Sequence, residues 1–219
     1  MRRGDEYYTA SKVDSANYCA RRFFLEYIER VKVSRLPAYA RGSLMHELAE
    51  HFWDRLGDSN AETKKARKKY TNAEEFSKYA CGKWICEVMR SERGNNPIAW
   101  NSEEEKWIIK SKIQKSALHL FEVLSKQPKP IFSEFPFGFY FDGFRWKGRI
   151  DEVQKGENGM IIIRDYKTGG KPNPKDMKVE NDPQPTFYCL ALSAMAKASR
   201  EFSERLGWDW EESKTLLGN

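Results

Sequence analysis

The sequence predicts an α/β protein with a central mixed sheet flanked by helices and with a helical insertion. Apolar residues recur at helical spacing over most of residues 11–128, at strand spacing over residues 132–167, and at helical spacing again over residues 184–205. Of the 219 residues, 40% are hydrophobic and 14% are aromatic. A chain of this size can bury roughly 70% of its unfolded surface. We therefore expect a single domain over residues 1–219.

The first half of the chain is expected to be helical. Aromatic and aliphatic residues predict an early amphipathic helix over residues 11–30, and apolar positions at intervals of four predict a second helix from Ala40 or Gly42. Residues 61–128 have helical spacing throughout, apart from one break. We expect residues 58–128 to be a helical insertion in the sheet-containing domain.

The segment that follows has the period of strands. Residues 132–141 are rich in aromatics, residues 144–153 alternate between apolar and polar, and a glycine-containing turn precedes a third strand over residues 160–167. These three segments predict an antiparallel meander. Residues 184–205 then return to helical spacing, and residues 200–219 are expected to form a charged helix.

Composition and charge favour some classes of protein and exclude others. No run approaches the about 18 apolar residues that span a membrane, so we expect no membrane contact. The N-terminus is charged and no apolar segment follows it, so we expect a cytoplasmic protein without a secretory signal. The 38 Lys and Arg exceed the 32 Asp and Glu, and the formal charge of +6 favours an anionic partner.

The cysteines indicate a reducing environment. Cys19, Cys81, Cys86 and Cys189 contain no Cys-x-x-Cys pair and are too sparse for a disulfide framework. We expect most of them to be small buried hydrophobic residues.

Charged residues gather where the third predicted strand ends. Asp165 and Lys167 have strand spacing, which would place them on one face about 7 Å apart, and Asp151 lies on the neighbouring predicted strand. Carboxylates that share a site are costly to desolvate unless a cation compensates, and a hard divalent cation suits their oxygens. Mg²⁺ or Mn²⁺ there would suit phosphodiester hydrolysis, with Lys167 positioning the water and the main-chain carbonyl of Tyr166 as a further ligand. The alternative is an exposed Asp–Lys ion pair of little energetic weight.

Four motifs follow one another along the chain. They are Gly42 to His46, Gly148 to Asp151, Asp165 to Lys167, and Gln184 to Tyr188. In this order they resemble the RecB-like exonuclease branch of the PD-(D/E)XK nuclease superfamily, and the resemblance covers nearly the whole chain. It implies a restriction-endonuclease-like core with its catalytic strands and Gln-x-x-x-Tyr helix within residues 129–205, and residues 58–128 as part of a DNA channel.

The resemblance assigns roles to the residues of the first three motifs. It implies that Asp151 and Asp165 are the metal carboxylates and that Lys167 is the catalytic lysine. His46 is expected to bind the metal or to orient the attacking water. Taken alone, His46 would more often be a surface or core histidine.

Other residues are expected to support this site. Gln184 and Tyr188 resemble the pair that binds near the DNA. Glu134 resembles a recurrent glutamate on the first strand of the branch, and we expect it to contact the ligands rather than the metal. Glu50 lies one turn after His46. It either forms a hydrogen bond or assists a second metal at the site, or it belongs to a solvated helix face.

Basic and aromatic residues are candidates for contact with DNA. A basic run either contacts phosphates or forms a solvated face: Lys64, Lys65, Arg67, Lys68 and Lys69. Six aromatic residues either stack on bases or belong to the core: Trp84, Trp100, Trp107, Phe139, Tyr140 and Trp146.

The sequence departs from part of the branch in its cysteines. The related CRISPR-associated adaptation nucleases hold a [4Fe-4S] cluster with one cysteine before the His motif and three after the tyrosine helix. Here no cysteine follows Cys189. We therefore expect no iron-sulfur cluster.

The resemblance implies metal-dependent hydrolysis of DNA. The expected activity is that of an exonuclease on single strands or DNA ends, in recombination, repair, replication or CRISPR-type processing. No Walker A loop is present, so unwinding would need a helicase or recombination partner, and the sequence is compatible with an oligomer. Two alternatives stay open: a non-catalytic DNA-binding module on a nuclease scaffold, and a structure-specific endonuclease.

Overall fold

A computed structural model describes residues 7–55, 70, 72–94, 97–167 and 183–215. The chain divides into two compact units. The sheet unit comprises Met1–Lys32, Pro130–Asp165 and Pro172–Asn219, and the helical unit comprises Val33–Lys129 and Tyr166–Lys171. The helical unit begins at Val33, well before the expected insertion at residue 58. The single nuclease domain over residues 1–219 stays a prediction.

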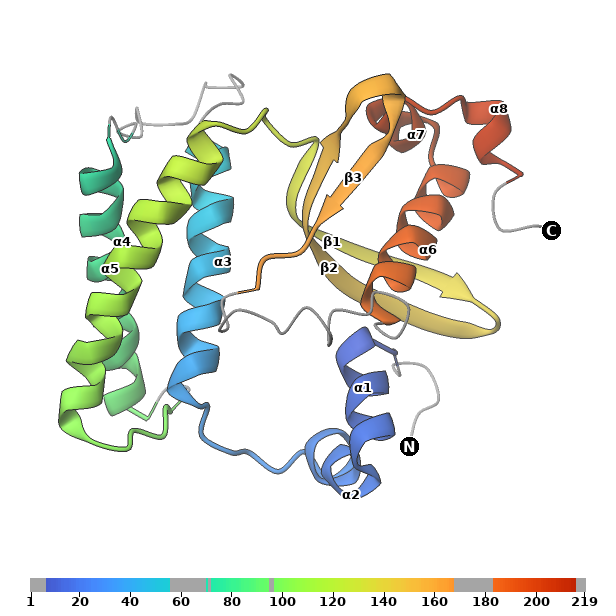
Figure 1. The fold of residues 1–219 in the computed structure, drawn as a ribbon. Helices are drawn as coiled ribbons and strands as arrows, with labels where there is room; N and C mark the ends of the chain where they lie inside the picture. Colours follow the sequence, from blue (N-terminus) through green and yellow to red (C-terminus); the bar gives the residue numbers. More distant parts are fainter. Residues whose placement is uncertain (1–6, 56–69, 71, 95–96, 168–182, 216–219) are drawn as a thin grey trace, which may run out of the picture. The chain divides into compact units, whose positions relative to one another are not determined.

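The described residues of the helical unit form three helices: α3 (Pro37–Arg55), α4 (Ala73–Glu92) and α5 (Glu103–Ser125), drawn from light blue to green in Figure 1. Each start has a local cause. Proline is favoured in the first turn, so α3 begins at Pro37, earlier than expected. The side chains of Asn72 and Ser102 accept hydrogen bonds from the backbone of the first turns of α4 and α5.

The core of the helical unit is apolar. Its largest fully buried side chains come from all three helices: Leu48, Phe76, Trp84, Ile113 and Leu124. Between α4 and α5 the predicted break is present, and it is stabilised by an isolated parallel bridge between Arg35 and Ile98. Backbone hydrogen bonds of 2.9 Å join Arg35 to Pro97 and to Ala99 at this bridge.

The N-terminal helix of the sheet unit is not continuous, contrary to the prediction for residues 11–30. It consists of α1 (Ala10–Tyr18), α2 (Ala20–Phe23) and the π-helical turn η1 (Phe24–Ile28). Cys19 has an extended backbone with φ −160° and ψ 107°, and this conformation ends α1. Extended backbone within a helical pattern could not be anticipated from hydrophobic spacing.

The sheet has three antiparallel strands in the order β1 (Phe132–Phe141), β2 (Phe144–Lys155) and β3 (Ile161–Arg164). Asp142 and Gly143, with φ of 51° and 74°, form the tight turn between β1 and β2. The 3₁₀ turn η2 (Glu157–Gly159) leads into β3.

The expected mixed sheet is not observed among the described residues. Both ladders are antiparallel, and the parallel pairing in the sheet unit is a single bridge between Tyr8 and Trp146. The antiparallel meander predicted from the spacing is confirmed. The predicted third strand is too long, since β3 ends at Arg164 rather than Lys167.

The C-terminal part forms three helices, where one helix over residues 184–205 was expected. These are α6 (Pro183–Ala198), α7 (Arg200–Leu206) and α8 (Trp210–Ser213). Ser199 has extended backbone and its side chain accepts a hydrogen bond from the Phe202 N–H, so it ends one helix and caps the next. Figure 1 shows α6 alongside β1 and β2.

The core of the sheet unit lies between the strands and α6 with α7. Its most buried members are Ile150, Val153, Tyr188, Ala191, Leu192, Ala196 and Leu206. Among the described helices, none combines the length and the hydrophobicity that a membrane crossing requires. The prediction of buried cysteines is wrong: Cys19 and Cys81 are half-buried, whereas Cys86 and Cys189 are exposed.

Candidate active site

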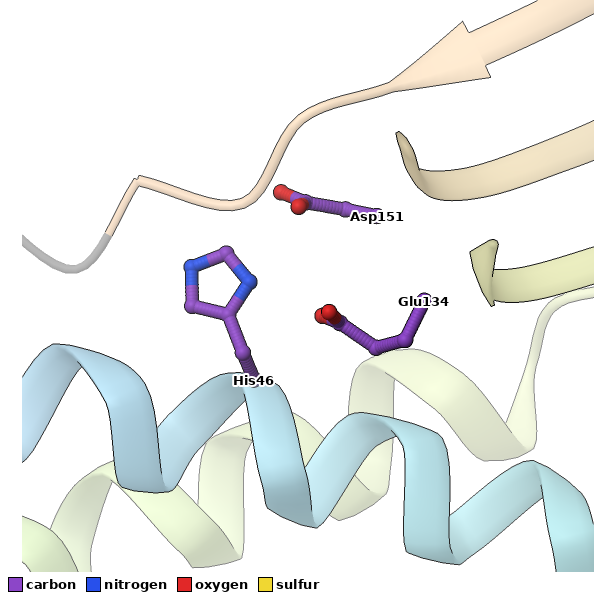
Figure 2. Close-up of side chains that lie close together, drawn as sticks. All are labelled: His46, Glu134 and Asp151. Atoms are coloured by element: carbon purple, nitrogen blue, oxygen red, sulfur yellow. The ribbon is translucent and has the colours of Figure 1, made fainter. Parts of the chain in front are cut away.

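Two carboxylates face each other across β1 and β2. Ser133 pairs with Glu152 and Phe135 with Ile150, so the same register places Glu134 opposite Asp151. Glu134 is 6% exposed and Asp151 is 7% exposed. Their carboxylate oxygens lie within 4.8 Å of each other, and Figure 2 shows both side chains.

The core-facing alternation of both strands shifts by one residue at this pair. The core members are Phe132, Phe135, Phe137 and Phe139 on β1, and Trp146, Ile150 and Val153 on β2. Core members are two or four residues apart elsewhere on these strands but three apart from Phe132 to Phe135 and from Ile150 to Val153. Glu134 and Asp151 lie within these two intervals of three. Glu134 has a φ of 47°, which costs a residue with a Cβ roughly 1–3 kcal/mol. Backbone strain of this kind is concentrated at functional sites, and here it accompanies a carboxylate pair.

The glycine of the Gly-x-x-Asp motif has a packing role. Gly148 pairs with Phe137 across the strands, and a Cβ on Gly148 would lie 2.5 Å from the Phe137 ring. A Cβ atom cannot lie so close to a ring carbon. Glycine at position 148 therefore makes room for the Phe137 ring in the core. Gly148 thus allows the tight packing of the strand pair just before Asp151.

The pair places two acidic side chains on adjacent strands of the sheet unit. Like charges directly opposite each other on neighbouring strands destabilise a sheet. Nη1 of Arg149 lies 3.6 Å from Oε2 of Glu134, but the Arg149 side chain is 59% exposed. Solvent around the arginine weakens its attraction for the buried carboxylate. A hard divalent cation fits this donor set better, because carboxylate oxygens are the ligands that Mg²⁺ and Mn²⁺ prefer.

Asp165 follows the end of β3 and is held by the first turns of α6. Nε2 of Gln184 donates to Oδ1 of Asp165 at 2.9 Å, and the Tyr188 hydroxyl donates to the same oxygen at 3.4 Å. Gln184 also hydrogen-bonds the Tyr188 hydroxyl. The spacing of four residues puts Gln184 and Tyr188 on one face of α6, and this is why the motif has that spacing.

Tyr188 remains a hydrogen-bond donor. Burial raises the pKa of its hydroxyl well above the usual range, and Asp165 and Asp151 raise that pKa further. The neutral hydroxyl can therefore donate to Asp165 at any physiological pH. Asp165, Gln184 and Tyr188 also line a shallow pocket of the sheet unit together with Ile161, Ile163, Pro185 and Cys189.

The other predicted site residues belong to the helical unit. His46 and Glu50 lie on α3, and both are half-buried. The His46 ring meets the Tyr166 ring edge-on with centroids 6.3 Å apart. The chain passes between the units after Asp165, so Tyr166 and the exposed Lys167 are assigned to the helical unit. Because β3 has already ended, the same-face argument for Asp165 and Lys167 does not apply.

The remaining predictions on DNA contacts have mixed outcomes. The basic run lies outside the described residues: Lys64, Lys65, Arg67, Lys68 and Lys69. Trp84 and Phe139 are buried in the two cores, whereas Trp100 and Trp146 are half-buried. Trp107 and Tyr140 are exposed.

The facing position of Glu134 was not anticipated, although the sequence contains a signal for it. An Asp-Gly turn at Asp142 and Gly143 fixes the hairpin register, and counting outward from it places Glu134 opposite Asp151. The same count places Arg149 opposite Pro136, two residues from Glu134 along β1.

Comparisons with known proteins show the family of the chain. The sequence profile of the PD-(D/E)XK nuclease superfamily matches residues 7–213. Gene 69 protein of Mycobacterium phage L5 is 41% identical over 68 residues, which are 31% of this chain and 20% of that protein. The match thus spans about one fifth of the length of this relative. No solved structure matches the chain. With a profile match over nearly its whole length and a carboxylate pair on adjacent strands, the chain belongs to the PD-(D/E)XK nuclease superfamily.

Proposed function

We propose that this protein is a divalent-metal-dependent deoxyribonuclease of the RecB-like branch. Its substrate would be single-stranded DNA or DNA ends inside the cell, in recombination, repair, replication or CRISPR-type processing. The observation that carries the proposal is the facing pair of Glu134 and Asp151, buried at a strained position of a nuclease-family sheet. The order of the four sequence motifs supports the branch.

Asp151 and Asp165 are the proposed carboxylate ligands of Mg²⁺ or Mn²⁺, with His46 and the main-chain carbonyl of Tyr166 as further ligands. The carboxylates of the sheet unit support this assignment, since they supply hard oxygen donors. When bound, the ion supplies Lewis-acid stabilisation of the charge that develops on the phosphate and lowers the pKa of a water molecule. His46 is assigned from its motif.

The protein's own residues orient the chemistry. Gln184 and Tyr188 fix the carboxylate of Asp165 through two hydrogen bonds to its Oδ1 oxygen. Such contacts set the orientation of a metal ligand. Their loss typically lowers metal affinity or activity by about 10- to 100-fold. Lys167 is proposed to position the attacking water or to stabilise the transition-state charge. Glu134 and Glu50 are proposed to support these groups.

The proposal is tested with linear DNA, single-stranded or duplex, labelled at one end. Wild-type protein, Lys167→Ala and the control Lys112→Ala are compared in Mg²⁺, in Mn²⁺ and in EDTA. Lys112 is an exposed lysine of α5 and carries the same charge. We expect metal-dependent release of short products by wild type and the control, and none by Lys167→Ala.

A closed circular single strand separates the two modes of cleavage. An exonuclease leaves the circle intact, whereas a structure-specific endonuclease opens it. DNA binding without any cleavage in either metal would contradict the nuclease and favour a binding module on a nuclease scaffold.

A further inference from the structure

One face of the β1–β2 hairpin, drawn in yellow in Figure 1, carries a row of cations. Arg145, Lys147 and Arg149 occupy alternate positions of β2, and all three are exposed. Their partners on β1 are Tyr140, Gly138 and Pro136, which are exposed as well. Trp146, between Arg145 and Lys147, packs against the core, and alternate residues of a strand share a face, so the three cations share the solvent-facing side. We call this row the basic strip.

The basic strip leads to the carboxylate pair. Alternate residues of a strand lie about 7 Å apart, so the strip from Arg145 to Asp151 is about 20 Å long. The next alternate position after Arg149 is Asp151, and the next one after Pro136 on β1 is Glu134. The ion pair of 3.6 Å between Arg149 and Glu134 joins the two groups. Three cations therefore stand in line with Asp151 on β2, beside Glu134 on β1.

The charge of the strip is available to an external anion. Within the described parts of the chain, Arg145 and Lys147 have no carboxylate at ion-pair distance. Nζ of Lys147 lies 3.1 Å from the centre of the Tyr7 ring, and Nζ of Lys12 lies 4.2 Å from the centre of the same ring. The Tyr8 backbone bonds to β2 at Arg145 and Lys147 and holds this segment against the strand. Lys12 is thereby placed beside the strip and adds a further cation to it.

An exposed aromatic ring marks the far end of the strip. Tyr140 is 74% exposed and pairs with Arg145 across the hairpin. Aromatic side chains beside a line of cations are typical of proteins that bind single strands, because an unpaired base can stack on the ring while the cations contact phosphates. In a duplex the bases are already paired and stacked, so Tyr140 would have no such partner.

We propose that the basic strip binds the backbone of single-stranded DNA and that Tyr140 stacks on one of its bases. The strip then directs the strand toward Asp151 and Glu134. This inference rests on the proposed function for the identity of the polymer as DNA, and it names the strand class that the site accepts.

Binding of a fluorescent oligo-dT to the full chain in EDTA tests the strip without cleavage. The triple variant R145Q/K147Q/R149Q is compared with K78Q/R90Q/R200Q, which removes the same charge from three exposed positions elsewhere. Each lost phosphate contact lowers the slope of log affinity against log salt by about 0.7 for single strands. We expect the strip variant to lose about 2 from this slope and on the order of tenfold in affinity, and the control to keep both.

Tyr140→Ala provides an independent measurement if the triple variant does not fold. We expect it to weaken binding about tenfold and to leave the salt slope unchanged, because stacking releases no counterions. Equal slopes for the two triple variants would overturn the strip, since net charge alone would then explain binding. Competition by duplex DNA at the same or a lower concentration would overturn the assignment to single strands.

Failure of the strip and failure of the nuclease proposal give different results. Lys167→Ala is expected to lose cleavage in Mg²⁺ and still to bind oligo-dT in EDTA. Cleavage by wild type with unchanged binding in the strip variant would overturn the strip alone. Weakened binding in the strip variant, with no cleavage by wild type in any metal, would overturn the nuclease alone.

Discussion

The two units bury charge in different ways. In the described part of the helical unit the buried charge is Lys106, whose Nζ lies 2.7 Å from Glu92 and 2.7 Å from Glu103. Hydrogen bonds to Glu103 and to Glu92 raise the pKa of Lys106, so it stays charged and balanced. In the sheet unit the buried charges are acidic and lie on two adjacent strands, at Glu134, Asp151 and Glu152.

This is the difference expected between structural charge and the charge of the proposed metal site. Lys106 has its countercharges beside it. Glu152 has one too, because Nε of Arg164 lies 3.5 Å from its Oε1 and the two residues pair across β2 and β3. Glu134 and Asp151 instead face each other across two strands, and the arginine beside Glu134, Arg149, has a side chain that is 59% exposed. Like charges held together at the expense of stability are typical of cation sites.

The largest expected effect is the loss of activity when a carboxylate of the sheet unit becomes an amide. Asp165→Asn should lower kcat for single-stranded DNA by at least about 10³-fold, because the amide cannot supply a charged metal ligand. Glu103→Gln in the helical unit is the matched control and should keep activity within about twofold. Equal losses of kcat in the two variants would contradict the claim that only the carboxylates of the sheet unit serve catalysis.

The next effect is on stability and belongs to the helical unit. Phe76 is fully buried among apolar side chains, so Phe76→Ala should lower the free energy of unfolding by about 3–5 kcal/mol in urea titrations. Tyr18→Ala changes an exposed ring and should stay within about 0.5 kcal/mol. The protein that remains folded in Phe76→Ala should keep its kcat. A large fall in kcat for the folded fraction of Phe76→Ala would mean that the apolar core takes part in catalysis.

A smaller effect is expected where Asp165 is oriented. Gln184→Ala removes a hydrogen bond of 2.9 Å to Asp165 and should lower activity about 10- to 100-fold with little change in melting temperature. Gln114→Ala on the exposed face of α5 is the control. Activity equal to wild type in Gln184→Ala would show that Asp165 does not need this contact.

The smallest effect concerns the facing carboxylates. In EDTA, Glu134→Gln should raise the free energy of unfolding by about 0.2–1 kcal/mol, because it removes a like-charge pair across the strands. Glu152→Gln on the same sheet should lower stability instead, because it breaks the pair with Arg164. Thermal melts of both variants in EDTA check the two signs. Destabilisation by Glu134→Gln would mean that its charge is already balanced.

Local patterns predicted much of the fold but not its interruptions. β1 spans the predicted residues 132–141, because aromatic alternation and the Asp-Gly turn act locally. The helix break at Cys19 and the early end of β3 depend on backbone conformations that hydrophobic spacing does not encode. The prediction of buried cysteines was wrong because their burial depends on tertiary packing.

The candidate site was partly predictable for the same reason. The contacts of Gln184 and Tyr188 with Asp165 follow from a four-residue spacing on one helix face. The left-handed backbone of Glu134 has no sequence signature, since glutamate does not favour it. The assignments of His46 and Lys167 stay predictions from motif order, as does the absence of an iron-sulfur cluster.

Titration calorimetry with Mn²⁺ tests the central claim most directly, because it needs neither DNA nor cleavage. Wild type, Asp151→Asn, Asp165→Asn and the control Glu103→Gln are compared. We predict that wild type and the control bind Mn²⁺ alike and that each Asp→Asn variant binds at least about tenfold more weakly. Equal Mn²⁺ affinity in all four proteins would contradict a metal site built on the carboxylates of the sheet unit.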